Sequence, residues 1–332
     1  MLTAALREVE QLVLLGDVIE LRQGPVREAL RAAEPVLAAL GGALGPGGRV
    51  VVVPGNHDHR LLAGWFERRG RAGAPPPLAL DAVVDGWSAG EPLAVIADAL
   101  APAAVEVRYP GVWLRPDVYA THGHYLDRHT TVPLFERLGA GAMARIVDDG
   151  DHGPREVDSY EAILAPMYAW IHELAQHGGP SLGRSSHGPS RQAWRALEGS
   201  RRRTLRTRGM AVGFRVLIAA LSRSSLGPLR ADISGPELRR AALRAFGEVL
   251  ARLEVQARHV IFGHTHRAGP LRADEVAEWV TGSGMRLLNT GSWVHEPGHL
   301  GTRPAQSPYR AGFCTVLGPE GAPELANLLD AR

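Results

Sequence analysis

Four short apolar runs in the sequence each end in side chains that could bind a metal ion or transfer a proton. Each run is too short for a surface helix and is typical of a buried strand. The polar residues that follow the runs are Asp17, Asn56-His57-Asp58, His122 with His124, and His264 with His266. Carboxylate, amide and imidazole ligands without a thiolate suit Mn²⁺, Fe, Zn²⁺ or Mg²⁺, and they do not suit a structural zinc cluster.

We expect these four groups to lie together, because loops at the carboxyl ends of strands carry the functional side chains of α/β proteins. A carboxylate such as that of Asp17 can bridge two cations through its two oxygens. His264 and His266 stand two residues apart and can project toward neighbouring ions. Two ions about 3.5–4 Å apart would lower the pKa of a shared water and hold the oxygens of an in-line phosphoryl displacement.

The elements that position these side chains follow from the hydrophobic pattern. The sequence predicts strands at Gln11–Leu15, Val50–Val53, Val105–Arg108, Val112–Leu114, Val118–Thr121, His259–Phe262, Met285–Leu288 and Phe313–Leu317. It predicts helices at Pro25–Leu40, His59–Arg69, Pro92–Leu100 and Tyr160–Gln176, with Gly41-Gly42 ending the first. The first two strands and the helix between them form a βαβ-like unit, which places Asp17 and Asn56 at one edge of the sheet.

The order of the motifs resembles that of the calcineurin-like metallophosphoesterase family. The matching motifs are GD (Gly16-Asp17), GNHD (Gly55–Asp58), HGH (His122–His124) and GHTH (Gly263–His266), and the resemblance covers about residues 11–128 and 255–317. It implies an α/β fold, a four-layer α/β/β/α sandwich with a two-metal site. It also implies a hydrolase that cleaves a phosphoric monoester, diester or pyrophosphate by in-line attack of a metal-bound water.

The resemblance also implies roles for individual residues. It makes Asp17 the bridging ligand, assigns the second metal to Asn56, His122 and His264, and places His266 on the first metal.

His57 matches the family's catalytic histidine, which protonates the leaving-group oxygen or stabilises charge on the transferring phosphoryl group. Glu20 and Asp58 are two alternative partners for its ring. His59 and His124 are candidates for contact with substrate or metal, and Asn289–Trp293 is expected to form a wall of the site.

The sequence departs from the family in one motif. Members begin with a strand ending in Asp-x-His, which supplies two ligands of the first metal, and no Asp-x-His precedes Asp17. The sheet is therefore expected to lack its first strand. Three explanations stay open: a start codon assigned too far downstream or a fragmentary gene, which we favour; a one-metal or inactive descendant that binds phosphorylated ligands; and replacement of the ligands by Asp148-Asp149-Gly150-Asp151-His152.

The expected domain organisation is a sandwich formed by residues 1–129 and 236–332, with an inserted helical, arginine-rich cap at 130–235. Between Arg184 and Arg230 there are eleven arginines and one acidic residue, Glu198. These guanidinium groups could hold a phosphorylated small molecule or lipid, or contact an anionic membrane surface. A solvated helix face is the plainer reading. Aromatic residues do not interleave the arginines, so a nucleic-acid partner is not expected.

Composition sets the remaining limits. The chain has 332 residues, 45% hydrophobic content and a formal net charge of +2, and all 37 of its basic residues are arginine, which indicates a bacterial coding bias. Its single cysteine, Cys314, excludes an internal disulfide. With no secretory signal and no long apolar stretch, the expected location is the cytoplasm, with peripheral membrane contact through the cap as a further option. The oligomeric state is not predicted.

Overall fold

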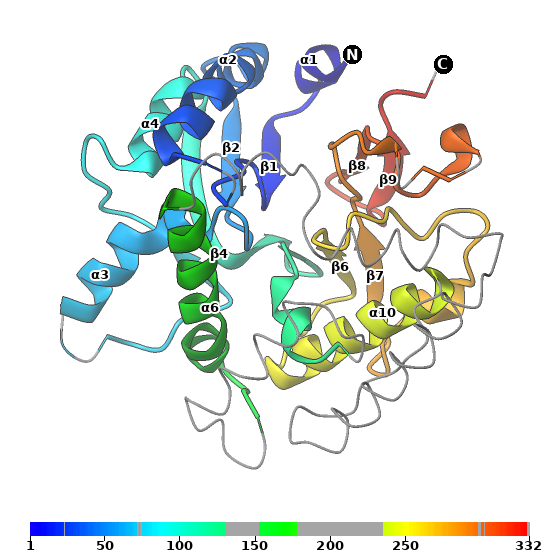
Figure 1. Cartoon of the computed structure of the whole chain (residues 1–332). Coiled ribbons are helices and arrows are strands. Elements are labelled where there is room, and N and C mark those ends of the chain that lie inside the picture. Colours follow the sequence, from blue (N-terminus) through cyan, green and yellow to red (C-terminus); the bar gives the residue numbers. More distant parts are fainter. Residues whose placement is uncertain are drawn as a thin grey trace, which may run out of the picture. The chain divides into compact units, whose positions relative to one another are not determined.

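The computed structural model describes residues 1–22, 24–71, 73, 75–130, 153–177, 235–297, 300–301 and 303–330. They form a mixed α/β structure whose main sheet is mostly parallel (Figure 1). The chain divides into two compact units. Unit 1 comprises Met1–His124, Glu156–Asp158 and Leu253–Arg332, and unit 2 comprises Tyr125–Arg155 and Ser159–Arg252. The expected boundaries were 129 and 236, whereas unit 2 begins at Tyr125 and includes the helix at Gly235–Arg252, and Glu156–Asp158 belongs to unit 1.

The main sheet of unit 1 has seven strands. The strands are β1 (Gln11–Leu15), β2 (Arg49–Val53), β3 (Asp81–Val83), β4 (Ala104–Arg115), β5 (Val118–Thr121), β6 (His259–Phe262) and β7 (Arg286–Asn289). Their order is β1-β2-β4-β5-β6-β7, and β3 pairs with β4 in antiparallel fashion. A separate antiparallel pair is formed by β8 (Phe313–Val316) and β9 (Glu324–Asn327). The short strands β3 and β9 were not predicted.

The long strand β4 pairs with different neighbours along its length. The sequence predicts two strands here, and the structure has one of 12 residues. Its first part, from Ala104 to Val107, pairs in parallel with β2, and its last part, from Gly111 to Arg115, pairs in antiparallel fashion with β5. The residues between the two parts, 108–110, pair with β3. Pairing with one neighbour after another along its length keeps the whole segment extended.

This register brings the carboxyl ends of two sets of strands to one place. β1 and β2 run along β4 toward its middle, with Val52 of β2 opposite Val107. β5 runs the other way, with Thr121 opposite Gly111, and β6 and β7 are parallel to β5. The loops that follow β1, β2, β5 and β6 therefore meet at the middle of β4.

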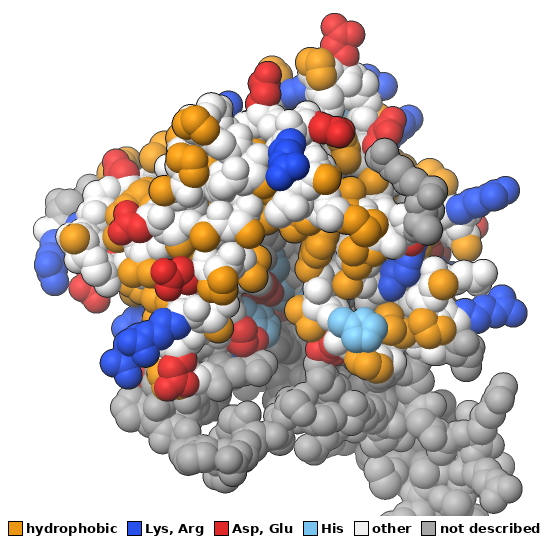
Figure 2. Space-filling model, turned by 90° about the horizontal axis from the view of Figure 1, so that it is seen from above, with side chains coloured by type: hydrophobic (Ala, Val, Ile, Leu, Met, Phe, Trp, Pro, Cys, Tyr) orange, Lys and Arg blue, Asp and Glu red, His pale blue; other side chains and the backbone are white. Residues whose placement is uncertain are grey.

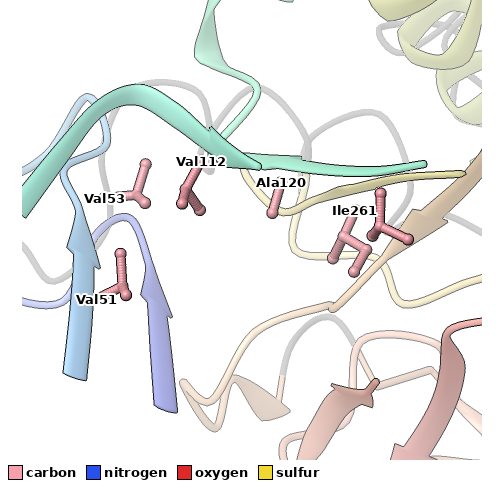
Figure 3. Packing of buried hydrophobic residues seen from close by; sticks show 6 residues of the cluster. Val51, Val53, Val112, Ala120 and Ile261 are labelled. Carbon is pink, nitrogen blue, oxygen red and sulfur yellow. The ribbon is translucent and has the colours of Figure 1, made fainter. Parts of the chain in front are cut away.

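The hydrophobic core of this region joins both halves of the sheet. Val51 and Val53 of β2, Val112 of β4, Val118 and Ala120 of β5, and Ile261 of β6 form one buried cluster (Figure 3). Val13 and Leu15 of β1 pack against the cluster but stay partly exposed, as do all five residues of β1. Among the described strands β1 pairs only with β2, so β1 and β7 are the two outer strands of the sheet.

The helices connect the strands or form unit 2. The α-helices are α1 (Leu2–Leu6), α2 (Val26–Leu44), α3 (Ala63–Arg71), α4 (Pro92–Ala99), α6 (Val157–His177) and α10 (Gly235–Arg252). The 3₁₀ helices are η1 (His59–Leu62), η2 (His124–Arg128), η3 (Val276–Trp279) and η5 (Pro304–Gln306). Within the described residues, every helix is too short or too polar to cross a bilayer.

Several expectations lie outside the described residues. They concern the arginine-rich segment Arg184–Arg230, the acidic cluster Asp148–His152 and most of the expected cap at 130–235.

Helix α2 continues past the glycine pair that was expected to end it. The helix runs to Leu44, and Gly45 follows with a φ of 74° and donates its amide to the carbonyl of Gly41. Gly41 is buried, and a Cβ atom built on it would lie 1.9 Å from the carbonyl oxygen of Leu100, the residue that follows α4. A Cβ on Gly42 would meet nothing within 4 Å. Gly41 therefore serves close packing and not helix termination.

This difference predicts opposite effects for two neighbouring substitutions. Gly41→Ala should lower the free energy of unfolding by about 1–3 kcal/mol, because the new methyl group overlaps the Leu100 carbonyl. Gly42→Ala should raise it by up to about 1 kcal/mol, because alanine is the better helix former and the space is open. Urea unfolding of both variants measures this, and equal effects would contradict the close approach of α2 and Leu100.

Candidate metal centre

Three ligand atoms from three different loops converge where the strands end. Asp17, His122 and His264 each offer one ligand atom, and the three atoms lie within 4.8 Å of one another. The Oδ2 atom of Asp17 lies 3.2 Å from Nε2 of His122. Asn56 from the β2 loop places its Oδ1 atom 3.2 Å from Nε2 of His122 and 3.2 Å from Nδ1 of His264. Four of the five expected metal ligands are thus in contact.

The ring of His122 is oriented by the backbone of β1. Its Nδ1 atom lies 3.0 Å from the carbonyl oxygen of Leu15, which can only accept a hydrogen bond. A proton on Nδ1 leaves Nε2 facing Asp17 and Asn56. A carbonyl bonded to the second ring nitrogen is the usual support of a metal-binding histidine, because it selects the tautomer that coordinates.

Two glycines make room for this arrangement. Gly16 has a φ of +82°, and a Cβ atom built on it would lie 2.1 Å from Nδ1 of His122. A Cβ on Gly55 would lie 2.5 Å from Oδ1 of Asp17 and 2.7 Å from Cδ2 of His122. Any other residue at either position would displace a ligand side chain.

The charges of the cluster are strongly coupled. Burial alone would raise the pKa of Asp17, but the neighbouring His122 and His57 hold it well below its usual value. Burial alone would lower the pKa of His122, but the charge and hydrogen bond of Asp17 raise it to about 9. In the absence of a cation, a proton on His122 thus balances the Asp17 carboxylate.

His57 is paired with Glu20. The Nδ1 atom of His57 lies 2.6 Å from Oε2 of Glu20, while the backbone amide of His57 donates to Oδ1 of Asp17 at 2.9 Å. Burial opposes the protonated form of His57, but the hydrogen bond to Glu20 raises its pKa above the usual value. Of the two carboxylates considered as partners for this ring, Glu20 is the one in contact with it.

Asp58 is hydrogen-bonded to the backbone of two loops. Its side chain is fully buried and accepts hydrogen bonds from the backbone amides of Asp17, Val18 and Gly55. Burial and the neighbouring charge of Asp17 raise the pKa of Asp58 to about 6. The structure therefore gives Asp58 backbone partners in place of the catalytic partner that the sequence suggested.

The remaining candidate histidines lie around the cluster. His124 and His59 are 1% and 9% exposed, and both rings contact Tyr109, whose hydroxyl group lies 3.1 Å from Nε2 of His124. They belong to a buried aromatic group, and the ring centroid of His124 also lies 5.6 Å from that of His122, so that contact with substrate or metal stays a prediction for both. His266 is not one of the three residues with converging atoms. Burial lowers the pKa of His266 to about 4, although the charge of nearby Asp17 acts in the opposite direction.

Two residues that shape the site were not assigned these roles from the sequence. Asn289 is 1% exposed, and its Nδ2 atom donates to the carbonyl of Gly263 and to Oγ1 of Thr265, at 2.9 Å each. It therefore holds the GHTH loop, although it was expected to be only wall. Tyr109 supports His124 from the middle of β4. A polar residue directly after an apolar strand is a usable signal for Asn289, whereas Tyr109 lies within a strand and carries none.

The candidate ligands are shielded from solvent, whereas the neighbouring His57–Glu20 pair is partly exposed. The side chains of His122 and Asp17 are 3% and 18% exposed, whereas those of His57 and Glu20 are 32% and 37% exposed. The molecular surface is hollowed in the middle of the face drawn in Figure 2, and histidine and acidic side chains are visible in the depth of this hollow. The His57–Glu20 pair is thus partly exposed to solvent.

The close contacts at Gly55 predict that a side chain at this position weakens metal binding. Gly55→Ala should weaken the binding of Mn²⁺ or Zn²⁺ by tenfold or more, on the order of 1.4 kcal/mol, because its methyl group displaces Asp17 and His122. Gly47→Ala is the matched control, since a Cβ there meets nothing within 4 Å. Isothermal titration calorimetry compares the two, and equal affinities would contradict the crowding at Gly55.

The raised pKa of His122 predicts that metal affinity depends on pH. A cation needs the neutral ring, so binding must release the proton that His122 holds below a pH of about 9. The affinity should therefore rise by up to about tenfold per pH unit between about pH 6 and pH 8. Calorimetry in two buffers of different ionisation enthalpy measures the released protons, and binding without proton release would contradict the protonated state.

No protein-family model matches this chain, and neither does any curated protein or solved structure.

Proposed function

We propose that the protein is a metal-dependent hydrolase of phosphoric esters, related to the calcineurin-like metallophosphoesterases and built on their sandwich fold. The observation that carries the proposal is the convergence of Asp17, His122 and His264 beside the His57–Glu20 pair. The order of the GD, GNHD, HGH and GHTH motifs supports it, as does the mostly parallel sheet with these motifs at the strand ends.

The residues present fit a divalent cation. One carboxylate, one amide oxygen and two imidazoles form a ligand set of oxygen and nitrogen. The Leu15 carbonyl keeps a proton on Nδ1 of His122, so that loss of the second ring proton leaves Nε2 free to coordinate. Mn²⁺, Fe and Zn²⁺ are the metals that suit it best, with Mg²⁺ as a further option. When bound, such an ion would lower the pKa of water and neutralise charge on a phosphoryl group.

His57 is the proposed general acid. Glu20 holds its Nδ1 atom, which turns Nε2 away from Glu20. The half-open position of this pair lets Nε2 donate a proton to the oxygen that leaves the phosphorus atom. The raised pKa of His57 keeps the ring protonated at a higher pH than usual, so the proton is present when the ester bond breaks.

The number of bound metal ions distinguishes the proposed hydrolase from a second candidate function. The resemblance implies two, with His266 on the first, and the described residues bring together one set of three ligand atoms. That single set favours, as a second candidate function, a protein that holds one ion and binds a phosphorylated small molecule or lipid without cleaving it. Turnover of a phosphate ester decides between the two.

Two substitutions test the proposed roles. His57→Ala should lower the turnover of p-nitrophenyl phosphate or its bis-ester by about 10²–10⁴-fold, because the leaving oxygen loses its proton donor. The metal content should stay nearly unchanged. Asp17→Ala should lose both the metal and the turnover. Elemental analysis and a colorimetric assay measure the two quantities, and equal metal loss in both variants would show that His57 is a ligand and not the acid.

A further inference from the structure

Asp58 ties the β1 and β2 loops together. Its Oδ2 atom accepts the amide of Val18 at 2.8 Å, and its Oδ1 atom accepts the amides of Gly55 at 2.6 Å and Asp17 at 3.3 Å. The side chain is 0% exposed. Both carboxylate oxygens are thus directed at backbone amides, two of them on the loop that carries Asp17.

The tie is reciprocal. Asp58, on the β2 loop, accepts amides of the β1 loop, while Asp17, on the β1 loop, accepts the amide of His57 on the β2 loop. Asp17 also has a φ of 53°, a left-handed conformation that is unfavourable for a residue other than glycine. Hydrogen bonds to the amides on both sides of the Asp17 side chain hold the backbone in this conformation.

We propose that Asp58 is a positioning residue that presents Asp17 to the cation, and that it acts through the backbone amides of Asp17 and Val18. The inference rests on the proposed function, since it assumes that Asp17, His122 and His264 bind a metal ion. It gives Asp58 a role in metal binding that does not depend on contact with the His57 ring.

The chemistry of the contact requires a carboxylate. Three N–H donors point at its two oxygens, so an amide side chain at this position would turn its own N–H₂ group toward at least one donor. Asp58→Asn keeps the shape of the side chain and leaves one buried backbone donor without an acceptor. If the Oδ1 contacts are kept, the unmatched donor is the amide of Val18, next to Asp17.

The first experiment compares the full-length protein with Asp58→Asn in the binding of Mn²⁺ and Co²⁺. We expect Asp58→Asn to weaken both affinities by about 10–100-fold, the usual effect of losing a group that orients a ligand. The visible spectrum of bound Co²⁺ should change as well, because the position of the Asp17 oxygen changes. A purely structural role would lower stability and leave the affinity and the spectrum of the folded protein unaltered.

Asp158→Asn is the matched control. The Oδ2 atom of Asp158 also accepts a backbone amide, that of Leu78 at 2.7 Å, and Asp158 is not part of the metal site. It should bind both ions as the unaltered protein does. Equal affinities for Asp58→Asn and Asp158→Asn would overturn the inference and leave the metal site standing. Failure of the unaltered protein to bind either ion would instead overturn the proposed function, and the inference with it.

A measurement on the unaltered protein keeps the inference testable if Asp58→Asn does not fold. Hydrogen exchange monitored by NMR without metal should show slow exchange at the amides of Val18 and Gly55, because Asp58 already holds both. Exchange at the rate of an open loop at either amide would overturn the inference.

Discussion

The arrangement of the site depends on the two-sided pairing of β4. One half of this strand carries β2 in parallel and the other half carries β5 in antiparallel fashion, so the carboxyl ends on both sides stop near its middle. The β1 and β6 loops reach the same place because β1 follows β2 and β6 follows β5 in register. Four loops that are far apart in the sequence thus supply one cluster of candidate ligands, and the apolar cluster along β2, β4, β5 and β6 holds them there.

The two carboxylates of the site, Asp17 and Asp58, both have hydrogen-bond donors around them. Asp17 faces His122 and the amide of His57, whereas Asp58 faces only backbone amides. His122 and His57 hold the pKa of Asp17 low, whereas burial and the neighbouring charge of Asp17 raise the pKa of Asp58 to about 6, against the opposite effect of its backbone amides. An isolated buried carboxylate is costly, and each of these has donors to offset its burial. The Asp17 carboxylate favours a positive charge beside it. Without a metal ion, the proton on His122 supplies that charge.

Backbone conformation shows where the chain departs from low-energy geometry. Among the described residues, four that are not glycine have positive φ, and three of them are the metal-site candidates Asp17, His264 and His266. Such conformations cost on the order of 1–3 kcal/mol each and persist only where surrounding contacts enforce them. The amide bonds to Asp58 act on Asp17, and Asn289 acts on the loop that carries the two histidines. The cost is offset by contacts that fix the backbone of the loops carrying the candidate ligands.

The sequence by itself determined the strands and their polar ends, because a run such as Val50–Val53 and the residues after it are read from local hydrophobicity. It thereby placed the polar groups after four strands at one edge of the sheet, and the family resemblance selected Asp17, Asn56, His122 and His264 among them, the four residues whose side chains are in contact. Tertiary structure decided what depends on long-range pairing. It joined two predicted strands into β4 and packed Gly41 of α2 against the carbonyl of Leu100. It also placed Glu20 in contact with the His57 ring, while Asp58 accepts hydrogen bonds from backbone amides of the loops. Asp58 is adjacent to His57 in the sequence and Glu20 lies 37 residues before it, yet Glu20 contacts the His57 ring, because the path of the folded backbone separates their roles.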